Sequence, residues 1–166
     1  MPASLNNSLN GKIALITGAS KGLGKAMALA LSQAGATIAL VSRDEAKLQA
    51  VKQEIEDSGG KAELFLADVK DEQQVERLET EVSNRLGKVQ ILVNNAGVNL
   101  RKNLIDFSLG EWQSVLDTNL TSVFLMCRKF VPHMRGPGYG RILNMTSIMS
   151  HVSLPEEDRH ATTLGE

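Results

Sequence analysis

Cysteine, an excess of one charge and long apolar runs are all scarce in this sequence, and each scarcity argues against a class of protein. The single cysteine, Cys127, excludes an internal disulfide framework and suits a reducing compartment. A formal net charge of -1, with both signs mixed along the chain, provides no basic surface for nucleic acid or an anionic membrane. No apolar run approaches the roughly 18 residues of a membrane span, and the first residues lack the regions of a secretory signal. We therefore expect a cytoplasmic protein.

The residues that are abundant suit one globular domain, since 42% are hydrophobic and 22% are charged. Short apolar runs alternate with segments of helical periodicity. The predicted strands are residues 12–17, 37–42, 62–67, 89–95 and 141–147, and the predicted helices are 22–34, 44–58, 71–87 and one or two within 108–135. This alternation is typical of βαβ units, so it predicts an α/β fold: a Rossmann-type, doubly wound, mostly parallel sheet.

A glycine-containing loop, "TGASKGLG", joins the first predicted strand to the first predicted helix. Backbone N–H groups in such a turn can approach a pyrophosphate at the helix N-terminus, where the aligned peptide dipoles favour an anion. The spacing is not GxGxxG, and glycines also serve as ordinary turn residues, but the strand-loop-helix context favours dinucleotide binding. The predicted contacts are Gly18, Ser20, Lys21, Gly22, Leu23 and Gly24.

The end of the second predicted strand indicates which dinucleotide is bound. An acidic side chain there would hold ribose hydroxyls, whereas a basic one would hold a 2′-phosphate. Arg43 stands at this place, 19 positions after Gly24, and Lys21 adds a second positive charge. The sequence therefore favours NADP(H) over NAD(H). Alternatively, Arg43 is a surface residue opening a helix, and Asp44 beside it weakens the charge signal.

Further motifs follow in order: Asp68 after the third strand, "NNAG" at 94–97, "DTN" at 117–119 and "NMTS" at 144–147. Together with the glycine loop they resemble the short-chain dehydrogenase/reductase family over about residues 9–155. Within that family the sequence is most similar to the 3-oxoacyl-acyl-carrier-protein reductase and gluconate 5-dehydrogenase group. The resemblance implies an oxidoreductase that transfers a hydride between nicotinamide and a ketone or secondary alcohol.

The resemblance also implies a role for each matched residue. Asp68 and Val69 would contact the adenine, and the residues lining the cofactor cleft would be Asn94, Ala96 and Gly97. Asn119 would hold a water of a proton relay. Ser147 would hydrogen-bond the substrate oxygen whose charge changes during hydride transfer. Alternatively, read from the residues alone, Asn94 and Asn95 are turn residues at a strand end, and Ser147 is a capping or loop hydroxyl.

One family motif is not matched: the acid/base tyrosine, with a lysine four residues later, about a dozen residues beyond the serine. The position 13 residues after Ser147 holds His160, and four further lies Leu164. A histidine can donate a proton, but the lysine is absent and the surrounding segment has no periodicity. The only tyrosine, Tyr139, lies in a glycine-rich loop before the fifth strand and is predicted to be a turn residue.

These observations divide the sequence into a flexible N-terminus (1–10), an NADP-binding domain truncated after the fifth strand (11–155) and a disordered tail outside the family (156–166). An uncovered fifth strand predicts aggregation. The family implies homo-oligomers, through helices that include one absent here. No metal site is expected, because His133 and His151 lack spaced partners. Two functions remain: an NADP(H)-dependent oxidoreductase impaired by the missing tyrosine and lysine, or an inactive product that at most binds the dinucleotide.

Overall fold

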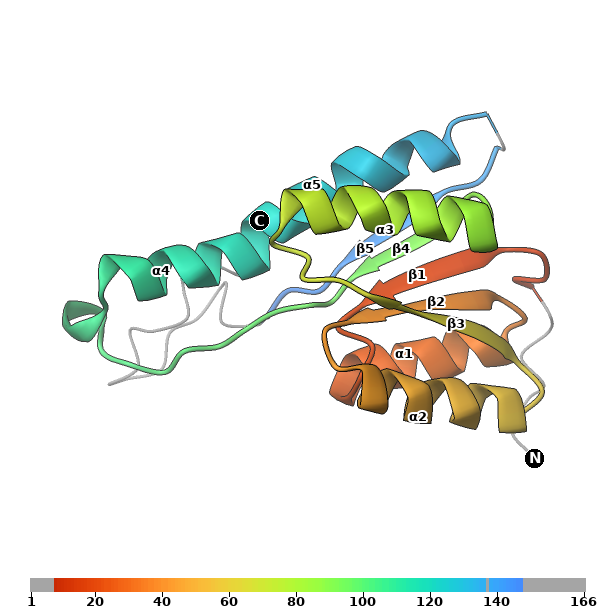
Figure 1. Ribbon diagram of the computed structural model, residues 1–166, viewed down its shortest axis with the longest axis horizontal. Helices are drawn as coiled ribbons and strands as arrows, with labels where there is room; N and C mark the ends of the chain where they lie inside the picture. Colours follow the sequence, from red (N-terminus) through yellow and green to blue (C-terminus); the bar gives the residue numbers. More distant parts are fainter. Residues whose placement is uncertain (1–7, 137, 148–166) are drawn as a thin grey trace.

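A single parallel sheet organises the computed structural model, which describes residues 8–136 and 138–147 (Figure 1). The order β3-β2-β1-β4-β5 is that of a doubly wound sheet, as predicted. Its strands are β1 (Ile13–Thr17), β2 (Thr37–Ser42), β3 (Lys61–Leu66), β4 (Ile91–Asn94) and β5 (Arg141–Asn144). All five predicted strands are present, although β4 and β5 are shorter than their apolar runs.

Helices cover both faces of the sheet. The helices α1 (Gly22–Gln33) and α2 (Glu45–Asp57) lie on one face, and α3 (Glu72–Arg85) and α5 (Ser122–Phe130) lie on the other (Figure 1). Successive side chains of a strand point to opposite faces. Leu15 of β1 accordingly packs in the core under α3 and α5, whereas Ile16 packs in the core under α1 and α2. This double burial explains why the central strands are continuous apolar runs.

The segment predicted to hold one or two helices is a single helical run with a change of pitch. It comprises α4 (Leu109–Leu116), a π-helical turn (Asp117–Thr121), α5 and a short 3₁₀ turn (Val131–Met134). A capping box between Ser108 and Glu111 starts α4, and no side chain of α4 is fully buried. Figure 1 shows α4 extending beyond the carboxyl end of the sheet.

The chain enters the domain before β1. The Leu9 N–H donates to the Ala34 carbonyl at 3.0 Å, so Leu9 is already tied to the end of α1. The predicted tail 156–166 lies outside the described residues, and the domain limits stay a prediction. Across 8–136 and 138–147, every helix is too short or too polar to cross a bilayer.

Candidate functional site

The loop between β1 and α1 is built on close contact between two glycines. Gly18 has φ +65°, a conformation that L side chains rarely adopt. A Cβ added to Gly24 in the first turn of α1 would lie 2.3 Å from the Gly18 carbonyl oxygen. Gly24 is therefore required for the helix to pack against the loop. It is not among the residues that line the cleft described below, and its contact with the cofactor stays a prediction.

A second set of contacts, missed from the sequence, joins this loop to the end of β4. The Thr17 hydroxyl oxygen accepts the N–H groups of Asn95 and Ala96, each at 3.0 Å. The Asn95 side-chain amide donates to the carbonyls of Thr17 and Gly18 at 3.0 and 3.3 Å. A hydroxyl closing an otherwise apolar strand is the signal that could have pointed to Thr17. These bonds hold the β1 and β4 ends together.

A cleft of about 540 Å³ opens at the carboxyl ends of the strands, beside the point where the strand order reverses between β1 and β4. Ligands of open α/β sheets bind at this place. Ten predicted contacts line it: Gly18, Ser20, Lys21, Gly22, Leu23, Arg43, Asp68, Val69, Ala96 and Gly97. Lining residues missed from the sequence include Ser42, Asn95, Val98 and Thr118. Four predicted residues do not line it: Gly24, Asn94, Asn119 and Ser147.

At one end of the cleft, Arg43 and Asp68 face each other across the ends of β2 and β3. The guanidinium Nη1 lies 3.3 Å from the Asp68 carboxylate, and the Arg43 side chain is 68% exposed. The Asp68 N–H donates to the Gln74 side chain at 2.9 Å, which fixes the loop after β3. Both predicted side chains therefore stand at one end of the cleft, with Lys21 in the same lining.

Asn94 lies beneath the cleft rather than in its wall. Its side chain is buried, and its Nδ2 donates to the Asn144 side chain at 2.9 Å, across the β4–β5 pair. It also contacts the sulfur of the half-buried Cys127 at 3.5 Å. The Asn94 Oδ1 has no hydrogen-bond partner among the described residues. The Asn94 side chain thus joins β4 to β5, because strand alternation turns it toward α5, and its role in lining the cofactor site stays a prediction.

Asn119 lies in the π-helical turn and binds the backbone of Val98 in two places. Its Oδ1 accepts the Val98 N–H at 2.8 Å, and its Nδ2 donates to the Val98 carbonyl at 2.9 Å. π-Helical turns are frequent at functional sites. Asn119 fastens the loop after β4 to the helical run, and its role in a proton relay stays a prediction.

Ser147 is half-buried and follows β5 by three residues, so it leaves the sheet at the same carboxyl edge as the cleft. Tyr139 precedes β5, and its ring lies against Lys12 and Arg141 at 4.7 and 4.8 Å. The four residues of β5 span about 13 Å, which separates Tyr139 from the carboxyl edge. Tyr139 is thus a structural residue. His160 and Leu164 lie outside the described residues.

His133 lacks spaced partners in the sequence, but in the fold it bonds to two other segments of the chain. Its Nδ1 accepts the Val89 N–H at 3.1 Å, and its Nε2 lies 2.7 Å from the Glu79 carboxylate of α3. Because Nδ1 accepts, the proton resides on Nε2 and is donated to Glu79. Within the described ranges, no three side chains of metal-binding type gather at one point; His151 falls outside those ranges.

Residues 12–163 match the short chain dehydrogenase family. The chain belongs to the short-chain dehydrogenase/reductase family of oxidoreductases, as its motifs predicted. Within that family it resembles the 3-oxoacyl-acyl-carrier-protein reductases and gluconate 5-dehydrogenases, also as predicted.

Three curated relatives illustrate the likeness. The 3beta-hydroxysteroid dehydrogenase of Mediterraneibacter gnavus is 37% identical over 87% of this chain and 52% of that protein. The 3-oxoacyl-acyl-carrier-protein reductase of Thermotoga maritima is 32% identical over 93% and 63%, respectively. The gluconate 5-dehydrogenase of Gluconobacter oxydans is 34% identical over 95% and 62%. The chain therefore spans between half and two thirds of the length of these relatives.

Solved structures share the fold closely. A short-chain dehydrogenase/reductase from Mycobacterium marinum has a TM-score of 0.90 at 37% identity, over 95% of this chain and 63% of that one. A metagenomic short-chain oxidoreductase in complex with NADP has a TM-score of 0.87 at 36% identity, over 94% and 70%. A nicotinamide dinucleotide is thus the ligand class bound by this family.

Proposed function

We propose that the cleft binds NADP(H), and that the protein transfers a hydride between the nicotinamide ring and a ketone or secondary alcohol. This proposal rests on one observation. The glycine loop, which includes Lys21, lines the same cleft as Arg43 at the end of β2. Its volume of about 540 Å³ falls within the range of about 300–1,000 Å³ that is usual for ligand pockets.

The glycine loop supplies the features that a pyrophosphate requires. Residues 20–23 line the cleft, and α1 begins at Gly22. The first N–H groups of a helix have no partner within the helix, and the helix dipole favours an anion beside them. The contact between Gly18 and Gly24 holds this loop in place, because no side chain separates the two backbones.

The cleft lining around Arg43 favours a 2′-phosphate. Arg43 is mostly exposed, and its bond to Asp68 is long for a charge-assisted hydrogen bond. A guanidinium has five N–H donors, so most of them are free to meet phosphate oxygens in a forked geometry. Lys21, in the same lining, adds a second positive charge. The relative solved with NADP is consistent with this choice of dinucleotide.

Bound NADP(H) would supply the hydride at the nicotinamide C4, and the chain would handle the substrate oxygen and the proton. Ser147 would donate its hydroxyl hydrogen to the substrate oxygen, which gains negative charge during ketone reduction. Asn119 would hold a relay water, beside the cleft wall that it fastens through Val98.

A second candidate function is dinucleotide binding without turnover. It is favoured by the sequence, which has no tyrosine 13 residues after Ser147, and by the place of Tyr139 at the amino end of β5. Loss of a positioned general acid reduces a rate by about 10²- to 10⁴-fold. For the present chain we propose binding, with turnover reduced by at least this factor.

Titrations of NADPH and NADH fluorescence test the binding proposal, and ketone-dependent loss of NADPH absorbance tests the chemistry. We expect Arg43→Met to weaken NADPH binding by about 10-fold or more, since hydrogen bonds to charged groups contribute about 1.5–3 kcal/mol, and to leave NADH binding unchanged. Lys88→Met removes the same charge before β4, at the other end of the sheet, and serves as the control. Absence of any NADPH response would overturn the proposed function.

A further inference from the structure

An acidic side chain, Asp44, stands directly beside the arginine assigned to the 2′-phosphate. At the end of this strand, an acidic residue typically holds the ribose hydroxyls and disfavours a phosphate. Ser42 and Arg43 line the cleft, whereas Asp44 is not among the lining residues. Its carboxylate is held instead by contacts with α2.

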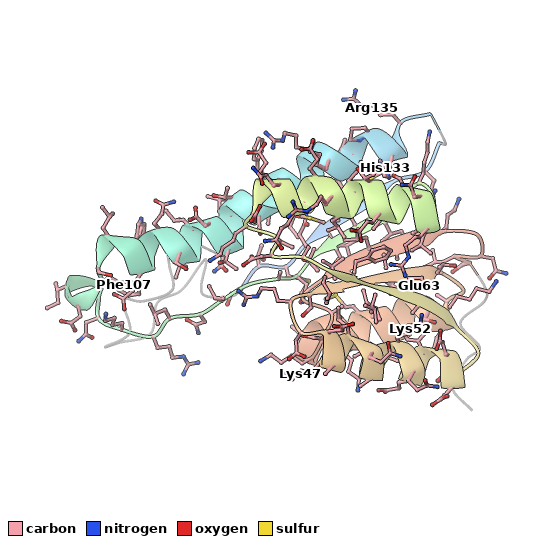
Figure 2. The ribbon with its side chains drawn as sticks, viewed as in Figure 1. Lys47, Lys52, Glu63, Phe107, His133 and Arg135 are labelled. Carbon is pink, nitrogen blue, oxygen red and sulfur yellow. The ribbon has the colours of Figure 1, made fainter. Side chains whose placement is uncertain are left out.

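The Asp44 carboxylate is occupied on both oxygens by one residue of α2. Asp44 is the N-cap of that helix, and its Oδ1 accepts the Lys47 N–H at 3.1 Å. The Lys47 ammonium bonds the other oxygen, Oδ2. The Asp44 N–H donates to the Ser42 hydroxyl at 3.1 Å, which fixes the turn between strand and helix. In Figure 2, Lys47 lies at the first turn of α2.

The charge of Asp44 nevertheless interacts with one cation of the cleft lining, Lys21. The Lys47 ammonium and backbone N–H hold the pKa of the Asp44 carboxyl below its ordinary value, and the more distant charge of Lys21 lowers this pKa further. Lys21 lines the cleft. The interaction of two charges is mutual, so an unpaired Asp44 carboxylate would attract Lys21. Lys21 would then bind a phosphate less strongly.

We propose that Lys47 is a positioning residue for cofactor choice: by binding Asp44 it turns an acidic side chain away from the cleft and favours NADP(H) over NAD(H). This inference rests on the proposed function. Lys47 is not itself among the lining residues, so it acts through Asp44. Asp44 then serves the helix as a cap without acting on the ribose.

A double-mutant cycle separates this mechanism from a direct attraction between Lys47 and the phosphate. NADPH and NADH affinities are measured by fluorescence titration for the full chain, Lys47→Met, Asp44→Ser and the double variant. Serine keeps an N-cap oxygen, so α2 keeps its start. We expect Lys47→Met to weaken NADPH binding by about three- to fivefold, the upper range for an exposed ion pair, with NADH unchanged.

In the Asp44→Ser background, Lys47→Met is expected to have no effect on NADPH affinity. Lys47→Arg, which keeps the ion pair, is expected to restore wild-type affinity, and Lys88→Met serves as the distant charge control. A loss that persists in the Asp44→Ser background, or an equal loss for NADH, overturns the role of Lys47. Wild-type protein that prefers NADPH, with an unchanged Lys47→Met variant, refutes only this inference. Wild-type protein that binds neither dinucleotide refutes the proposed function itself.

Discussion

The two edges of the sheet differ in how they are covered. At the β3 edge, Glu63 bonds both Arg85 and Lys52, and the Arg85 guanidinium donates to the Leu64 carbonyl at 3.3 Å. Figure 2 shows Lys52 and Glu63 close to each other on this side. At the β5 edge all four residues are exposed, and Leu143 is 44% exposed. Among the described residues, no strand pairs with the outer side of β5.

This difference separates a covered side of the sheet from an exposed side among the described residues. Charged side chains over an edge strand protect it from pairing with other chains, whereas an exposed apolar edge invites such pairing. The cleft is lined mainly by residues at or after the ends of β1, β2, β3 and β4, and of these strands β1, β2 and β4 are almost wholly buried. Ser147 follows β5, on the exposed side. The proposed dinucleotide contacts therefore lie on the covered side of the sheet, and the proposed chemistry at Ser147 lies beside the exposed edge.

The largest effect is expected from a change in the glycine loop, on the covered side of the sheet. Gly24→Ala places a Cβ 2.3 Å from the Gly18 carbonyl oxygen. Alanine favours a helix by about 1 kcal/mol over glycine, but a backbone clash of this kind costs about 1–3 kcal/mol or more and displaces the loop. We expect loss of the NADPH fluorescence response. Gly110→Ala, which meets open space in α4, is the matched control and is expected to bind normally. Normal binding by Gly24→Ala would contradict the packing argument.

The next effect concerns the bonds that join the ends of β1 and β4. Asn95→Ala removes two donors and leaves the carbonyls of Thr17 and Gly18 without them. We expect a loss of about 1–3 kcal/mol in the free energy of unfolding, measured by urea titration. Gln53→Ala removes one exposed side-chain bond, to Asp57, and is expected to change stability by less than about 0.5 kcal/mol. Equal losses in the two variants would refute the special role of Asn95.

The two edges can be tested against each other directly. Leu143→Lys places a charge on β5 and is expected to slow aggregation several-fold, whereas Arg85→Ala uncovers β3 and is expected to accelerate it. Light scattering at constant protein concentration measures both. Ile105→Lys is the control, because Ile105 is 92% exposed and distant from both edges in the chain. If Ile105→Lys slows aggregation as much as Leu143→Lys, general surface charge rather than the β5 edge is responsible.

The smallest effect concerns α4, which relies on local contacts because none of its side chains is fully buried. Bonds from Lys102 and from Ser108 lower the pKa of Glu111 from 4.5 to about 2. A carboxyl whose pKa is lowered by folding stabilises the protein above its unfolded pKa, and this stabilisation is lost as pH falls through the folded value. We expect a contribution to Tm that is full above pH 4.5, declines toward pH 2 and is absent in Glu111→Gln. Parallel pH profiles for the two proteins would contradict this.

Much of the fold could be predicted because apolar periodicity is local information. Continuous apolar runs predicted the strands β1 and β2, and apolar residues at helical spacing predicted the helix α3. The change of pitch at residues 117–121 was not predicted, because apolar periodicity does not distinguish a π-helical turn from an α-helical one; within this turn Asn119 bonds Val98, 21 residues away in the chain. The sequence likewise could not distinguish Asn94 from Asn95. Strand alternation sends one under α5 and the other to the glycine loop, and only the assembled sheet shows which side is which.

By itself, the sequence determined the family, the alternation of strands and helices, and most of the residues that line the cleft. These follow from short-range features: glycines at a turn, charges at a strand end and side-chain periodicity. Only the tertiary structure decided how those residues are used. It paired Arg43 with Asp68, turned Asp44 toward Lys47 and buried His133 between Val89 and Glu79, because hydrogen bonds and charges act over a few ångströms, between elements that the chain brings together only when folded.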